Sequence, residues 1–111
     1  MPTRPEVAEV EQAVVVSLSG ELDAYDAPSL RSTFTEVTAG REGAVVVLDL
    51  SAVSFLDSTA LGTIVGLLRR VREGDGELRV VLPESNARRI FELTSLDRTL
   101  DVRPSRASAL T

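Results

Sequence analysis

The segment Ala44-Val45-Val46-Val47-Leu48 is a continuous apolar run made mostly of β-branched valine. Such a run predicts a strand that is covered on both faces of its sheet. A helix is expected to follow, beginning at Asp57 or Ser58 and reaching about Glu73. Its apolar residues recur at helical spacing, which predicts a buried stripe along one side. The members of that stripe are Leu61, Ile64, Val65, Leu68 and Val71.

Two strands and a helix are predicted on the N-terminal side of this run. Residues 7–11 and 14–18 are rich in β-branched side chains and predict two strands with a turn at Gln12-Ala13. Gly20 is expected to end the second strand. Asp26 is a good N-cap for the helix that comes next.

The same alternation continues on the C-terminal side. Residues 78–82 predict another strand. Ser85 is expected to cap a third helix that turns Ile90 and Leu93 inward. Residues 99–103 predict a last strand at the edge of the sheet.

Strands that alternate with helices, in the order β-β-α-β-α-β-α-β, predict an α/β fold. We expect a single small mixed sheet of about five strands, mostly parallel, with helices packed on it. The whole chain, residues 1–111, suits one domain with an ordered core at about residues 7–103. Residues 1–5 and the tail after Arg103 are expected to be loose.

The composition excludes several kinds of chemistry. The chain has no cysteine, histidine or lysine, so disulfides, thiolate metal sites, Ser-His-Asp triads and lysine Schiff bases are all ruled out. A net charge of −5 disfavours binding to nucleic acid. Residues 1–5 lack the apolar stretch that is typical of a signal peptide, and the apolar run at 44–48 is too short to span a bilayer. We therefore expect a cytoplasmic protein that uses no cofactor.

Three carboxylates are candidates for a site. Asp23, Asp49 and Asp57 fall in or near loops that follow predicted strands, and ligands of such sheets bind beyond the carboxyl ends of the strands. A magnesium site like that of an aspartyl-phosphate receiver domain is one interpretation. The missing lysine and the two opening strands argue against it.

Asp57, Ser58 and Thr59 open the predicted helix, where such side chains commonly cap free N–H groups. Gly62 and Gly66 follow Ser58 along a stripe that faces away from the apolar one. Glycine inside an exposed helix costs about 1 kcal/mol relative to alanine, so two on one face require a reason. Either the stripe packs against another helix of the fold, or it is an open surface that binds another protein.

A hydroxyl at this helix start would also suit a phosphorylation switch. Phosphorylation adds roughly −1.5 to −2 charges. The helix N-terminus favours that charge by only about 0.3–1 kcal/mol, while Asp57 and Asp23 would repel it. The modified domain would stay folded while a docked acidic or apolar partner is expelled.

Asp57-Ser58-Thr59-Ala60-Leu61-Gly62 resembles the Asp-Ser-Ser/Thr-Gly-Leu-Gly motif of STAS-domain anti-sigma factor antagonists, with alanine in place of the family's first glycine. Gly20-Glu21-Leu22-Asp23 is similar to the Gly-Glu-Leu/Ile-Asp motif that follows their second strand. The resemblance spans residues 7 to about 102. Further matches are Asp49-Leu50, Phe55, Phe91-Glu92-Leu93 and Leu96.

The resemblance implies the STAS fold and a partner-switching cycle. The unphosphorylated antagonist binds an anti-sigma factor that is also a serine kinase, and a sigma factor is released. The kinase uses ATP and magnesium to phosphorylate the antagonist, which then dissociates, and a PP2C-type phosphatase resets it. The implied phosphoacceptor is Ser58, with Thr59 as the alternative. The expected partner-binding residues are Asp23, Asp57, Ser58, Thr59, Gly62 and Gly66.

Two other classes of function stay open. A STAS protein with another partner, such as a stressosome component or a lipid-transport subunit, would carry a similar motif. A small carboxylate-dependent enzyme would turn over a substrate alone, although we expect no catalytic residue. The chain is expected to be a monomer or a weak dimer.

Overall fold

The computed structural model describes residues 5–10 and 13–111, and within them the strands form one five-stranded sheet in the order β1-β2-β3-β4-β5. β1 is antiparallel to β2, and all other neighbours are parallel. The strands are β1 (Glu6–Val10), β2 (Ala13–Leu22), β3 (Val45–Leu56), β4 (Glu77–Val81) and β5 (Asp101–Arg103). This arrangement confirms the predicted α/β fold. The predicted loose residues 1–4 and Gln12 of the predicted turn lie outside the described residues, whereas Ala13, the other predicted turn residue, is the first residue of β2.

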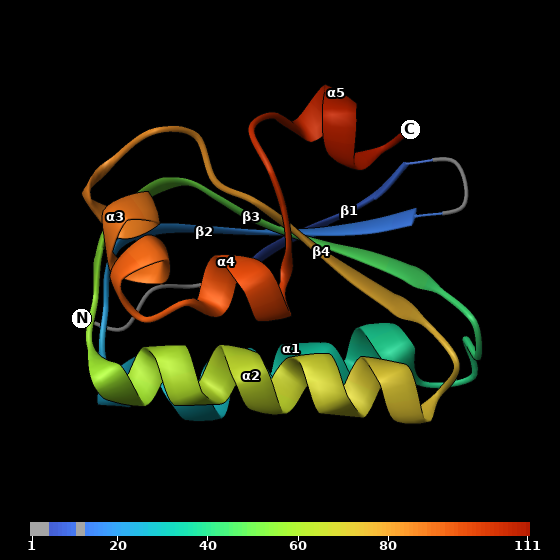
Figure 1. Cartoon of the computed structure of the whole chain (residues 1–111). Coiled ribbons are helices and arrows are strands. Elements are labelled where there is room, and N and C mark those ends of the chain that lie inside the picture. Colours follow the sequence, from blue (N-terminus) through green and yellow to red (C-terminus); the bar gives the residue numbers. More distant parts are fainter. Residues whose placement is uncertain (1–4, 11–12) are drawn as a thin grey trace.

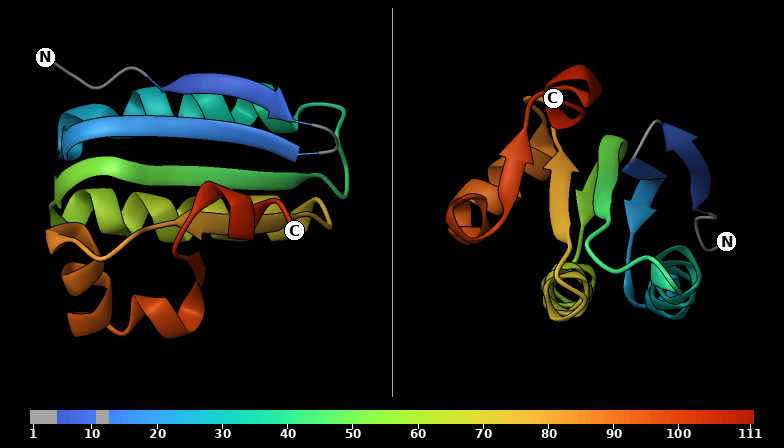
Figure 2. Two further views of the ribbon diagram at one scale, coloured as in Figure 1. Left: turned by 90° about the horizontal axis from the view of Figure 1, so that it is seen from above. Right: turned by 90° about the vertical axis from the view of Figure 1, so that its right-hand side faces the viewer.

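Two long helices, α1 and α2, lie side by side along one face of the sheet, and the short helix α5 lies on the other face (Figure 1 and Figure 2). Of the remaining helices, α3 contacts β3, and α4 contacts α3 and β5. The helical elements are the 3₁₀ turn η1 (Ala24–Asp26), α1 (Ala27–Thr38), α2 (Ser58–Glu73), α3 (Asn86–Leu93), α4 (Leu96–Thr99) and α5 (Arg106–Ala109). Across the described residues, none of these helices has the length and apolar character that crossing a membrane requires.

The central strands carry apolar side chains on both faces. Val16 of β2 and Leu48 of β3 are fully buried in the main core, together with Phe34 of α1 and Ile64 of α2. A smaller cluster lies on the opposite face of the sheet. Its buried members are Val15, Val47, Val81 and Ala109. The predicted burial of the 44–48 run on both faces is confirmed for its last three residues.

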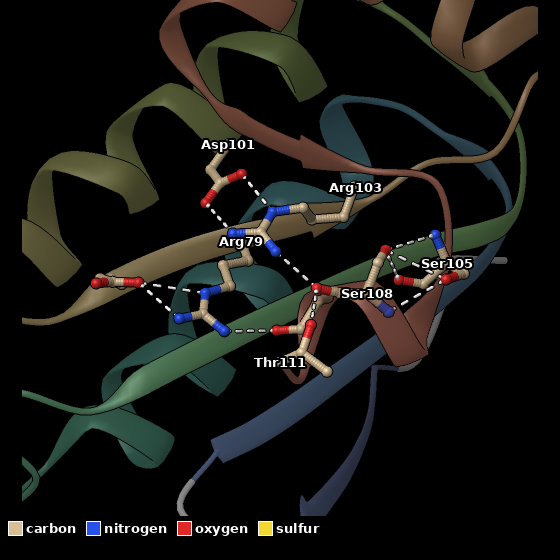
Figure 3. Close-up of polar contacts among 8 residues, drawn as sticks. Arg79, Asp101, Arg103, Ser105, Ser108 and Thr111 are labelled. Carbon is tan, nitrogen blue, oxygen red and sulfur yellow. Dashed lines mark hydrogen bonds and ion pairs between the residues drawn. The ribbon is translucent and has the colours of Figure 1, made fainter.

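The short helix α5 covers the smaller cluster. Arginines from two neighbouring strands bind the carboxyl end of this helix (Figure 3). Arg79 of β4 donates to the carbonyl oxygen of Ala109 at 2.7 Å. Arg103 of β5 donates to the carbonyl oxygen of Ser108 at 2.6 Å and is also paired with Asp101. The sequence predicts a loose tail after Arg103, whereas these contacts order α5 against the sheet.

β2 and β3 extend further than predicted. Gly20 does not end β2 but lies inside it with φ of 80°, next to a register shift against β3. Glycine adopts this left-handed conformation at little cost, so the strand bends and continues to Leu22. β3 likewise continues from Leu48 through Asp49 to Leu56. The predicted position of Asp49 in or near a loop is therefore wrong.

Two predicted inward faces are wrong in part. In α3, Phe91 is fully buried, while Leu93 is 79% exposed and Ile90 is half-buried. In α2, Leu61 and Val65 are only half-buried. The buried residues of α2 are Ala60, Thr63, Ile64, Leu67, Leu68 and Val71. The predicted bounds of α2, from Ser58 to Glu73, are confirmed.

Candidate functional site

Asp23 and Asp57 follow the carboxyl ends of two adjacent parallel strands. Leu22, the last residue of β2, lies in register with Leu56, the last residue of β3. The amide of Asp57 also donates to the carbonyl oxygen of Leu22 at 3.1 Å. The two sequence motifs therefore meet at one edge of the sheet, as predicted from the position of strand ends.

Asp57 is the residue that caps α2. Its backbone is extended, and its Oδ1 accepts from the amide of Ala60 at 2.8 Å. The Ser58 hydroxyl makes no hydrogen bond within the described part of the chain, and both Ser58 and Thr59 are exposed. Because the cap is already supplied by the neighbouring carboxylate, the Ser58 hydroxyl is accessible to another molecule.

Asp23 caps the short turn η1 beside this site. Its Oδ1 accepts from the amide of Tyr25 at 2.9 Å, while the amide of Asp23 donates to Oδ2 of Asp26 at 2.9 Å. Asp26 therefore closes a reciprocal capping box, and it does not cap α1 with its side chain as the sequence suggested. Asp23 stays exposed and adds a second negative charge at the edge of the sheet that carries Asp57.

A cleft of about 380 Å³ runs between α1 and α2, next to the start of α2. Its lining residues are Arg31, Thr59, Gly62, Thr63, Gly66, Leu67 and Arg70. We refer to it as the α1–α2 cleft. A Cβ atom added at Gly62 or Gly66 would meet no atom within 4 Å, apart from the backbone of α2 itself. The glycine stripe therefore faces open space and does not pack against another helix of this fold.

The structure does not bring Asp49 together with Asp23 and Asp57. Asp49 lies in the middle of β3, where its Oδ2 accepts from the Arg106 guanidinium of α5 at 2.7 and 3.0 Å. Burial raises the pKa of Asp49, but hydrogen bonds from Ser51 and Arg106 lower that pKa more, and the net value falls below the ordinary one. Over the residues that the structure describes, no group of three or more acids could hold a metal ion.

Sequence reasoning missed the charged residues of the α1–α2 cleft. No feature of the sequence singles out Arg31 or Arg70 as a site residue. The two arginines meet only through the packing of α1 on α2, so no local motif marks them. It also missed Tyr25, which is 80% exposed beside the two motifs.

Comparisons with known proteins agree with this geometry. The model of the STAS domain matches residues 4–109. An anti-sigma-B factor antagonist of Listeria monocytogenes is 35% identical over 88 residues, which cover 79% of this chain and 76% of the relative. One of Bacillus subtilis is 33% identical over 97 residues, covering 87% of each. The crystal structure of an anti-sigma factor antagonist from Mycobacterium paratuberculosis is 33% identical with a TM-score of 0.85, covering 97% of this chain and 91% of the other.

Proposed function

The chain belongs to the STAS-domain family of anti-sigma factor antagonists, and from this membership we propose that it is a phosphorylation-controlled binding switch. In its unphosphorylated form it binds an anti-sigma factor in the cytoplasm, so that a sigma factor is released. The anti-sigma factor is also a serine kinase, and its transfer of phosphate to Ser58 ends the binding. A PP2C-type phosphatase restores the binding form.

The observation that carries this proposal is that Asp57 caps α2 while the neighbouring Ser58 hydroxyl is left exposed. Asp57 supplies the helix cap through its bond to the Ala60 amide, so the exposed Ser58 hydroxyl has no structural task. Phosphate on Ser58 therefore leaves the fold intact. The change is confined to the surface, where roughly −1.5 to −2 charges appear beside Asp23 and Asp57.

Added charge at this position weakens binding in two ways. An apolar partner surface would have to remove water from the dianion, which is unfavourable. An acidic partner surface is repelled by it, and like charges placed close together across an interface cost several kcal/mol. The N-terminus of α2 stabilises the negative charge of the phosphate by only about 0.3–1 kcal/mol. The balance favours dissociation of the modified domain while its helix stays capped.

The test uses the purified chain, its anti-sigma factor kinase, ATP and magnesium. Calorimetry compares the wild type with Ser58→Ala and Ser58→Glu. Ser58→Ala is expected to bind the kinase like the wild type and to accept no phosphate. Ser58→Glu is expected to bind at least about tenfold more weakly, a loss of about 1.4 kcal/mol.

Fragment mass spectra identify the hydroxyl that carries the phosphate. Phosphate on Thr59 alone would move the switch one residue into α2. Equal binding by the wild type and Ser58→Glu would remove the electrostatic mechanism. Co-purification with a stressosome or a lipid transporter, without any kinase, would replace the proposed partner.

A further inference from the structure

We infer that the α1–α2 cleft receives an acidic segment of the anti-sigma factor, with Arg31 and Arg70 binding its carboxylates. This inference rests on the proposed function and names the chemistry of the partner at a surface next to Ser58. The two helices that form the cleft lie parallel to the sheet and side by side (Figure 2).

The charge inside the cleft is opposite to that of the chain as a whole. The chain carries a net charge of −5. Among the described residues that line the cleft, the charged ones are Arg31 and Arg70, and none is acidic. A locally basic groove on an acidic protein is complementary to carboxylates. Its attraction for an acidic partner weakens as ionic strength rises, because salt screens exposed charges.

Both arginines are available for a partner. They are exposed, and neither forms an ion pair within residues 5–10 and 13–111. Five other arginines are already paired with an acid of this chain. They are Arg41, Arg79, Arg88, Arg103 and Arg106. A guanidinium presents donors in a planar fork that matches a carboxylate, so Arg31 and Arg70 suit aspartate or glutamate side chains.

The floor of the cleft allows a second chain to come close. Gly62 and Gly66 carry no side chain, and the space above them is open. Buried Leu67 and Thr63 line the same cleft, and the Thr63 hydroxyl is already bonded to the Thr59 carbonyl. The floor of the cleft therefore offers few free polar groups, so Arg31 and Arg70 are the groups of the cleft that would bind the carboxylates of a partner.

The position of the cleft links it to the phosphorylation site. Thr59 lines the cleft near the start of α2 and Arg70 lines it further along, about 16 Å away at 1.5 Å per helical residue. A stretch of about five extended residues spans that distance. Ser58 directly precedes Thr59, so phosphate on Ser58 adds negative charge at the end of the cleft that an acidic segment would occupy.

Charge reversal tests the two anchors. Arg31→Glu and Arg70→Glu are compared with Arg89→Glu, an exposed change on α3 outside the cleft. Binding to the purified anti-sigma factor kinase is measured by calorimetry at low and high salt. We expect each cleft variant to bind at least about tenfold more weakly at low salt, with a smaller salt dependence, and Arg89→Glu to change binding by less than about twofold.

The outcomes separate this inference from the proposed function. If the wild type binds, Ser58→Glu does not, and both cleft variants bind normally, the switch stands and the acidic segment is wrong. An equal loss in all three arginine variants points to general attraction and also overturns the inference. If the wild type neither binds nor is phosphorylated by any anti-sigma factor kinase, both proposals fall.

Site-specific crosslinking identifies the occupant directly, because the chain contains no cysteine. Thr35→Cys, one helical turn from Arg31 on the exposed side of α1, carries a benzophenone maleimide and is incubated with the kinase, and Ala107→Cys on the opposite face of the sheet is the control. We expect a crosslink from position 35 alone, to a partner peptide with at least two Asp or Glu residues. A crosslinked peptide without acids, or a crosslink to a second copy of this chain, overturns the inference.

Discussion

At the scale of single residues, Asp57 and Ser58 show how neighbouring side chains at a helix start take different roles. Asp57 has an extended backbone and accepts from the Ala60 amide, which is the geometry of an N-cap. Ser58 is the first helical residue, and its hydroxyl makes no hydrogen bond with the described residues. A carboxylate that caps a helix also repels a phosphate on the next residue, so one side chain serves both stability and switching.

This division predicts unequal costs for the two alanine substitutions. Asp57→Ala should lower the free energy of unfolding by about 0.5–2 kcal/mol, because an amide at the start of α2 loses its acceptor. Ser58→Ala should change it by less than about 0.5 kcal/mol. Urea denaturation measures both. Asp57→Asn is the matched control, since asparagine caps equally well without charge. A larger loss of unfolding free energy for Ser58→Ala than for Asp57→Ala would show that Ser58, and not Asp57, caps α2.

The Asp49–Arg106 pair predicts a pH-dependent stability. Because the pKa of Asp49 is lowered in the folded chain, its contribution is present above the unfolded value of about 3.9 and is lost as pH falls through the folded pKa. Arg106→Ala should destabilise the protein by about 1–3 kcal/mol at pH 7, with a difference that shrinks in acid. Urea denaturation as a function of pH checks this, with the exposed Arg89→Ala as control. A constant difference from pH 7 down to pH 3 would contradict the ion-pair explanation.

At the scale of elements, α2 carries a glycine stripe that the fold itself does not need. Gly66→Leu should leave the thermal midpoint unchanged or raised, because glycine costs about 1 kcal/mol in a helix and the space above it is open. The same change should block binding of the anti-sigma factor. Scanning calorimetry and binding measurements test the two halves separately.

Gly76 supplies the contrasting variant. A Cβ atom there would lie 2.5 Å from the Ala44 carbonyl oxygen and 3.0 Å from the Val71 side chain. Gly76→Ala should therefore lower the thermal midpoint even though alanine is smaller than leucine. Unfolding of Gly66→Leu would show that the stripe packs internally, and the docking surface would be misplaced.

Sequence reasoning predicted well the elements whose ends and period are marked by unambiguous residues. The bounds of α2 follow from Asp57 and from an unbroken helical period. The end of β3 was missed because Asp49 and Ser51 break the apolar run, although a buried acid in a strand is tolerated when a distant arginine pairs with it. Arg106 lies far along the chain, so only the folded structure reveals that partner.

Helix faces were predicted less well where two periods compete. In α3, Ile90 and Leu93 are three residues apart, and Ala87 and Phe91 are four apart, so both pairs fit a helix. Packing against β3 selects the second pair. The site could likewise be predicted only in part. The ends of β2 and β3 place Asp23 beside Asp57, which the order of strands predicts. The α1–α2 cleft depends on how α1 packs against α2, which no local pattern predicts.

At the scale of the whole molecule, the chain is expected to have no turnover of its own. It has no histidine, cysteine or lysine, and the carboxylates of Asp23 and Asp57 at the candidate site cap η1 and α2. Purified protein, free of kinase, should hydrolyse neither ATP nor GTP above the buffer rate. Phosphate release that disappears in Ser58→Ala would contradict this expectation.

The position of α5 in the chain has a consequence for protein synthesis. All of the described strands precede α5, and a ribosome delivers the chain from its N-terminus. Val15, Val47 and Val81 therefore emerge before the helix that covers them. Until α5 docks, each nascent chain presents a row of bare valines, the kind of surface that chaperones recognise and that neighbouring nascent chains can share.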